Sequence, residues 1–182
     1  MPSPIAHAAA GFVVYQAYRS RLPAWAETRV GLAILVFIGL SLVPDLDLLP
    51  AVVLGDLKGI HNGITNSVVT ALVISAALGV VISRIAGGRF LLWFSAAIAS
   101  ISLHILMDYF AATRGIMAFW PITSDRFVAP VKLFYGFHYS EGLISIRHLW
   151  TALSELAFAA VLVTLAVLLP RIGKKTAQPA LD

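Results

Sequence analysis

The chain has 182 residues, of which 59% are hydrophobic and only 12% charged, and its 13 Lys and Arg against 9 Asp and Glu give a net charge of +4. A soluble domain carries about 25% charged residues, so the composition excludes a soluble globule and predicts an integral membrane protein. The absence of cysteine excludes disulfides, zinc–thiolate sites and cysteine nucleophiles. The cations form no single tract, and we therefore expect no nucleic-acid partner.

Five apolar stretches follow one another along the chain. Residues 5–18 are short for a membrane span and form either a tilted helix packed in the bundle or an interfacial helix. Residues 30–44 are expected to continue as a helix to Asp45 or Asp47. The stretches that are long enough to span, at about 17–25 residues each, are 59–83, 90–107 and 148–170.

These stretches predict an all-α, integral membrane helical bundle. We expect about four transmembrane helices, a short N-terminal helix and a long outer loop at residues 109–147. Residues 1–172 form a single membrane-embedded domain in this interpretation, and residues 173–182 form a polar cytoplasmic tail.

The basic residues of the short loops predict the orientation, because they favour the cytoplasmic side. They follow the first helix, bracket the turn at Gly87 and Gly88, and follow the last helix. These three ends, including the C-terminus, are therefore expected in the cytoplasm. This orientation brings ionisable residues of five segments to the opposite, outer level of the membrane: His7, Asp45, Asp47, His61, His104, Asp108 and Glu155.

The pair His104 and Asp108 has a spacing typical of a metal site. Residues four apart share one face of a helix, and a His and a carboxylate so placed can bind one metal ion, or the carboxylate can orient the imidazole. An interfacial His followed by a helix-ending Asp is an equal alternative. Asp45 and Asp47 follow Pro44 and offer two more carboxylates, although such a pair after a helix is often only a solvated loop.

The remaining candidates have ordinary structural alternatives as well. A lone histidine such as His7 on an apolar helix is most often a hydrogen-bonded packing residue. His61 precedes Asn62 and Thr65, either of which is an ordinary cap for the helix that follows. Glu155 lies inside a span, where a carboxylate costs roughly 2.5–3.5 kcal/mol and is a functional candidate by default; its alternative is a protonated, hydrogen-bonded glutamate between helices.

The ordered blocks resemble those of the YdjM-type bacterial proteins. They are the N-terminal helix with His7, residues 42–47 (LVPDLD), 61–67 (HNGITNS) and 104–108 (HILMD), and a later Trp-Pro at 120–121. Such proteins are described as metal-dependent hydrolases of the inner membrane, similar to the zinc-dependent phospholipase C and single-strand nuclease superfamily. The resemblance covers roughly residues 1–121. It implies a divalent metal, zinc in the first instance, with these ligands or immediate supports: His7, Asp45, Asp47, His61, His104 and Asp108.

The chain departs from the family's pattern in two places. The glycine-centred block usually reads HRGxTHS, whereas this chain has Asn62 for the Arg and Asn66 for the second His. An Asn oxygen is a poorer zinc ligand than imidazole, so one metal position is weakened, replaced or lost. The superfamily's late His-x-x-x-Glu pair has no match either. Further ligands or substrate contacts are therefore sought among Asn66, His138, Glu141, Arg147 and His148.

The leading functional hypothesis is a membrane metallohydrolase that acts on a phosphoester, possibly of a lipid, at the outer interface. A bound ion would lower the pKa of water to about 7 and polarise phosphoryl oxygens. Asp47 or Glu155 is the expected general base, and Arg147 or Arg126 the partner of a headgroup phosphate. The alternatives are a non-catalytic membrane protein with a structural or degenerate metal site, and an ion or proton carrier.

Overall fold

The computed structural model describes residues 2–56, 59–111, 114–136 and 146–176, and their regular structure is helical. This confirms the all-α prediction. The elements in chain order are α1 (Pro4–Tyr18), η1 (Arg19–Arg21), α2 (Trp25–Thr28), α3 (Val30–Leu42), η2 (Val43–Asp47), α4 (Leu48–Val53), η3 (Ile64–Asn66), α5 (Val68–Ala86), α6 (Phe90–Tyr109) and α7 (Ile146–Thr176).

Four helical segments are long and apolar enough to cross a membrane: Val30–Val53, Val68–Ala86, Phe90–Tyr109 and His148–Leu168. Only 11% to 39% of each apolar window is buried inside the protein. Many large apolar side chains of these segments are exposed, among them Leu35, Val73, Leu91 and Val161. Exposed apolar surface of this extent is unfavourable in water and favourable in lipid. The predicted membrane bundle of four spans is therefore confirmed.

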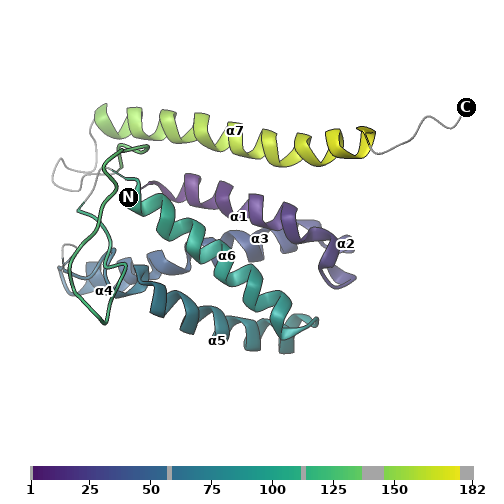
Figure 1. Ribbon diagram of the computed structural model, residues 1–182, viewed down its shortest axis with the longest axis horizontal. Helices are drawn as coiled ribbons and strands as arrows, with labels where there is room; N and C mark the ends of the chain where they lie inside the picture. Colours follow the sequence, from purple (N-terminus) through teal and green to yellow (C-terminus); the bar gives the residue numbers. More distant parts are fainter. Residues whose placement is uncertain (1, 57–58, 112–113, 137–145, 177–182) are drawn as a thin grey trace, which may run out of the picture.

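The helices run back and forth, so that one end of the bundle collects the start of α1, the end of α3 with η2, the start of α5, the end of α6 and the start of α7 (Figure 1). We call this end of the bundle the polar end. The N-terminus and the loop that follows α6 lie here as well. Antiparallel connection thus brings together residues that are far apart in sequence.

The N-terminal helix α1 lies inside the bundle, in contact with α3, α6 and α7. Of the two placements open from the sequence, the packed helix is therefore the one observed. A Cβ atom at Gly11 would come within 2.6 Å of the Phe37 carbonyl oxygen and 2.8 Å of the Ile38 Cα atom. Small residues allow this close approach of two helix backbones. In lipid no hydrophobic effect drives helices together, so the van der Waals packing at such contacts stabilises the bundle instead.

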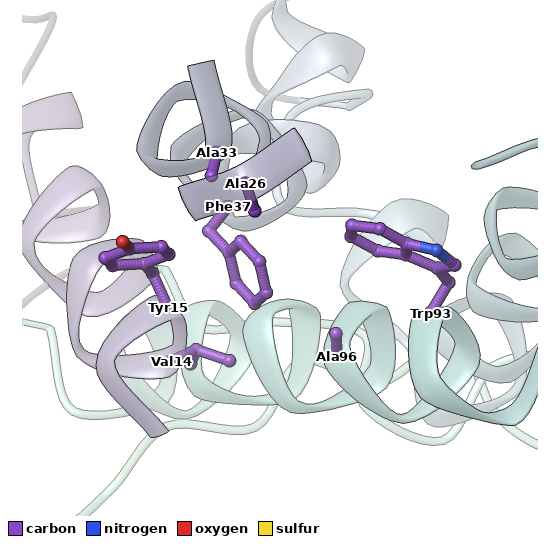
Figure 2. Packing of buried hydrophobic residues seen from close by; sticks show 7 residues of the cluster. All are labelled: Val14, Tyr15, Ala26, Ala33, Phe37, Trp93 and Ala96. Atoms are coloured by element: carbon purple, nitrogen blue, oxygen red, sulfur yellow. The ribbon is translucent and has the colours of Figure 1, made fainter. Parts of the chain in front are cut away.

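Aromatic side chains fill the bundle away from the polar end (Figure 2). Phe37 of α3 and Trp93 of α6 are fully buried and lie with ring centroids 6.2 Å apart. The indole N–H of Trp93 donates to the Gly87 carbonyl oxygen at 2.7 Å, so that its one polar group is satisfied. The two glycines of this turn have φ angles of 73° and 87°, a conformation that glycine adopts at no steric cost.

Two local expectations were wrong. The first span was expected to end at Asp45 or Asp47, but it continues through η2 and α4 to Val53. Pro44 fits the first turn of η2, where a missing N–H does no harm, and the apolar residues after Asp47 extend the helix. The cap of α5 is Ser67, whose Oγ accepts from the Thr70 N–H at 3.1 Å, and neither Asn62 nor Thr65 caps this helix.

Candidate metal centre

Three segments contribute ligand atoms to one point at the polar end. His7 comes from the first turns of α1, Asp45 from η2 and His104 from the last turns of α6. One ligand atom from each side chain lies within 4.8 Å of the others, a separation at which all three atoms can bind a single ion. His7 and His104 are fully buried, and their rings stack with centroids 3.7 Å apart.

Asp108 lies beside both histidines. Its Oδ1 is 3.5 Å from His7 Nε2, and its Oδ2 is 3.4 Å from His104 Nε2. Asp45 Oδ1 approaches the same His104 nitrogen at 3.5 Å. The i,i+4 pair predicted from the sequence is thus observed, and its carboxylate is shared with His7 of another helix.

The polar atoms of this cluster are poorly satisfied by the protein itself. Among the described residues, buried atoms without a hydrogen bond include both ring nitrogens of His7, both carboxylate oxygens of Asp45, His104 Nε2 and Asp108 Oδ1. A buried polar atom without a partner is costly and unusual. A cation among these atoms would satisfy them, and a set of imidazoles and carboxylates without thiolates suits zinc or a similar divalent ion. The residues present therefore fit a metal.

The residues around the cluster hold its ligands in place. The Ser41 carbonyl oxygen lies 2.8 Å from His104 Nδ1, and the Ser41 hydroxyl donates to the His7 carbonyl oxygen at 2.8 Å. Asn66 Nδ2 donates to Asp108 Oδ2 at 2.6 Å. Such outer contacts fix the tautomer and orientation of metal ligands. Asn66, considered from the sequence as a further ligand or a substrate contact, is thus a donor to Asp108. Ser41 was not predicted, although its position four residues before Asp45 was a usable signal.

Asp47 and His61 form a second unit, joined by a 2.6 Å contact between Asp47 Oδ1 and His61 Nδ1. Asp47 Oδ2 also accepts from the Asn62 backbone N–H at 3.1 Å and from the Thr65 hydroxyl at 2.5 Å. Both oxygens of Asp47 are therefore engaged within the protein, and this carboxylate orients the His61 imidazole. Thr65, considered only as a cap in the sequence analysis, is one of its supports.

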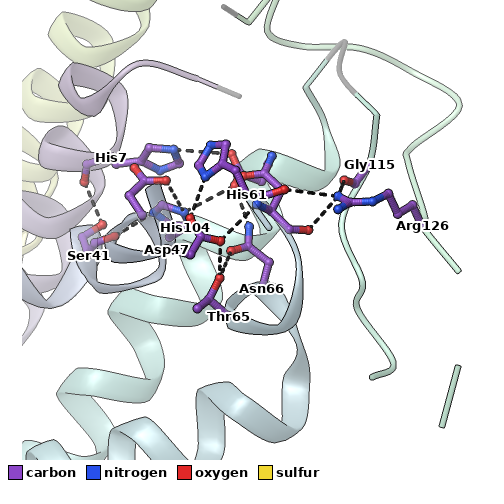
Figure 3. Close-up of polar contacts among 12 residues, drawn as sticks. His7, Ser41, Asp47, His61, Thr65, Asn66, His104, Gly115 and Arg126 are labelled. Carbon is purple, nitrogen blue, oxygen red and sulfur yellow. Dashed lines mark hydrogen bonds and ion pairs between the residues drawn. The ribbon is translucent and has the colours of Figure 1, made fainter. Parts of the chain in front are cut away.

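Arg126 holds the loop after α6 against this second unit. Its Nη1 donates to the Asn62 carbonyl oxygen at 3.0 Å and to the Gly115 carbonyl oxygen at 3.1 Å, and its Nη2 donates to the Gly59 carbonyl oxygen at 3.2 Å (Figure 3). Burial, and then the nearby Arg114 cation, lower the pKa of Arg126 from its usual value. These contacts fix the position of Arg126, because its planar guanidinium donates to several backbone carbonyl oxygens at once.

Glu155 lies at the same end of the bundle and is fully buried. Its Oε2 accepts from the Ser3 backbone N–H at 2.6 Å, while its Oε1 has no hydrogen bond. The carboxylate thus anchors the residue that caps α1, since the Ser3 hydroxyl accepts from the Ile5 N–H. Glu155 therefore positions the helix that carries His7.

Of the other late candidates, only His148 has a side chain that the structure describes. His138 and Glu141 lie outside the described residues, and for Arg147 the structure describes the backbone within α7 but not the side chain. His148 is half-buried near the start of α7 and is not a member of the group of described residues with converging ligand atoms.

Comparison with known proteins gives one match. No curated protein and no solved structure matches the chain. A family model described as YdjM inner membrane protein matches residues 1–177, which include every element of the bundle and both polar units. The chain therefore belongs to the YdjM inner membrane protein family.

Proposed function

We propose that this protein is a membrane-bound, metal-dependent hydrolase that acts on a phosphoester at the outer face of the inner membrane. One observation carries the proposal: buried His and carboxylate atoms from three segments converge at the end of a membrane bundle and lack hydrogen bonds within the described protein. Intramembrane ionisable groups are expensive and mark functional sites by default. The basic residues of the short loops support the outer placement.

The residues divide into two roles in this proposal. His7, Asp45, His104 and Asp108 hold a divalent ion, which when bound supplies a water of lowered pKa and polarises a phosphoryl oxygen. Asp47 holds a proton on His61 Nδ1, since its Oδ1 lies 2.6 Å away. This tautomer makes His61 Nε2 the nitrogen that accepts a proton from the attacking water. Asp47 and Glu155 were the bases expected from the sequence. Their contacts to His61 and to the Ser3 N–H favour positioning roles instead.

A generic phosphodiester tests the proposal with few assumptions. Protein reconstituted with zinc, and the same protein after chelation, are assayed with bis-(4-nitrophenyl) phosphate and with vesicles of phosphatidylglycerol. We expect metal-dependent hydrolysis that Asp45→Asn abolishes. Asp56→Asn is the matched control, because Asp56 is an exposed carboxylate of the same end whose contact is to the Gly59 N–H. Equal hydrolysis with and without metal would contradict the proposal.

A structural metal site is the second candidate, and Asn66 favours it. The family's pattern has a histidine here, whereas the Asn66 amide donates to Asp108 and adds no imidazole. In that case the protein binds metal tightly, Asp45→Asn lowers stability, and no phosphoester of a broad panel is turned over.

A further inference from the structure

A pocket of about 600 Å³ opens beside the second polar unit, within the range of about 300–1,000 Å³ typical of ligand sites. The metal cluster does not use it. It lies between the first and second spans and the loops of the polar end, and its lining includes Leu46, Asp47, Ile60, Ile64, Thr65, Ile74 and Met117.

The polarity of the lining changes along the membrane direction. Asp47 and Thr65, which belong to the second polar unit, lie at one part of the pocket. Ile74 lies six residues after the first residue of α5, or about 9 Å along that helix at 1.5 Å per residue. Most of the other lining residues are apolar. The lining thus combines polar groups near the start of α5 with apolar residues that include one deeper in this span, and this polarity matches an amphiphile.

Two apolar residues of the lining are exposed on the protein surface. Leu46 is 58% exposed and Ile64 is 47% exposed, although both line the pocket. Leu46 lies on the first candidate span, whose outer face is apolar. An amphiphile within the bilayer can therefore enter sideways without first dissolving in water.

We propose that this pocket holds one hydrocarbon chain of a membrane lipid, with the lipid's phosphate end beside His61 and the Arg126 guanidinium, which donates to the carbonyl oxygen of the lining residue Gly59 at 3.2 Å. The inference rests on the proposed function for the identity of the phosphoester, and it narrows the substrate class to lipids. The pocket binds the chain, and the neighbouring polar units meet the headgroup. Water-soluble phosphoesters lack the chain and are poorer substrates.

Photo-crosslinking tests the pocket without requiring turnover. Full-length protein is reconstituted in phosphatidylcholine vesicles that contain phosphatidylglycerol with a diazirine in one acyl chain, and labelled peptides are mapped by mass spectrometry. Ile74→Trp fills the pocket, while Val73→Trp places the same ring on the neighbouring, 64% exposed position outside the lining. We expect saturable labelling around Ile60, Ile64 and Met117 that Ile74→Trp removes and Val73→Trp preserves.

Two outcomes separate this inference from the proposed function. Saturable labelling that persists in chelated protein supports the pocket, whether or not phosphoesters are hydrolysed. Labelling that is spread over the lipid-facing helices, does not saturate and is unchanged by Ile74→Trp would overturn the pocket, even if bis-(4-nitrophenyl) phosphate is hydrolysed.

Discussion

The contact between α1 and α3 at Gly11 links helix packing to the metal centre. His7 lies one helical turn before Gly11, and Ser41 lies one turn after Phe37. The Ser41 hydroxyl donates to the His7 carbonyl oxygen, and the Ser41 carbonyl oxygen accepts from His104 Nδ1. In Gly11→Ala, the new methyl group meets the Phe37 carbonyl oxygen at 2.6 Å. Because the obstacle is backbone and cannot rotate away, the two helices must separate, and His7 moves with α1.

The size of the effect follows from two opposing terms. Overpacking costs about 1–3 kcal/mol, and contact with rigid backbone places this site at the upper end. Alanine in place of glycine in a helix returns about 0.5–1 kcal/mol. We therefore expect Gly11→Ala to lower the free energy of unfolding by about 2–2.5 kcal/mol. The displacement of His7 should also weaken zinc binding by about tenfold, the lower end of what loss of a supporting group does to a metal site.

Gly39→Ala is the matched control, because it changes a glycine of α3 with nothing within 4 Å of the new methyl group. Unfolding in detergent and zinc titration against a competing chelator are measured for both variants. Gly39→Ala should be unchanged or slightly more stable, by up to about 1 kcal/mol. If Gly11→Ala behaves like Gly39→Ala in both measurements, the close approach of α1 and α3 does not position the centre.

Further predictions concern the polar groups themselves. Asp47→Asn leaves His61 with a weaker partner and should lower the free energy of unfolding by about 1–3 kcal/mol, measured by denaturant titration, while zinc stoichiometry stays unchanged. Asn66→Leu removes the donor to Asp108 and should weaken zinc binding by about 10–100-fold in chelator competition; unchanged affinity would contradict the supporting role. Glu155→Gln keeps an acceptor for the Ser3 N–H and should leave thermal stability nearly unchanged, whereas Glu155→Leu should lower it. Bound zinc should be released as the pH falls below about 6, since metal-ligating imidazoles must be unprotonated; metal retention followed by atomic absorption tests this.

The regular features of the site were predictable from the sequence. Helical periodicity placed His104 and Asp108 on one face, and the observed contact confirms it. Alternating spans predicted that segments far apart in sequence would bring their ionisable groups to one end, and the shared position of His7, Asp45 and His104 agrees.

The division of the ligands into two units was not predictable, because it depends on local backbone geometry. Asp45 and Asp47 were treated as one pair, but they belong to a 3-10 helix with three residues per turn. Positions two apart on such a helix point about 120° away from each other. Asp45 consequently faces His104, whereas Asp47 faces His61. Sequence spacing alone does not distinguish this helical turn from a loop, in which the two carboxylates are free to face the same ion.

The proposed function requires one metal ion bound by His7, Asp45, His104 and Asp108. X-ray absorption spectroscopy of the zinc-loaded protein in detergent, together with its metal content, tests this claim most directly. We expect bound zinc with a first shell of nitrogen and oxygen at about 2.0–2.2 Å, and outer-shell scattering from two imidazoles. We also expect His104→Ala to lose the ion. Protein that binds no zinc, or whose zinc spectrum is unchanged in His104→Ala, would contradict it.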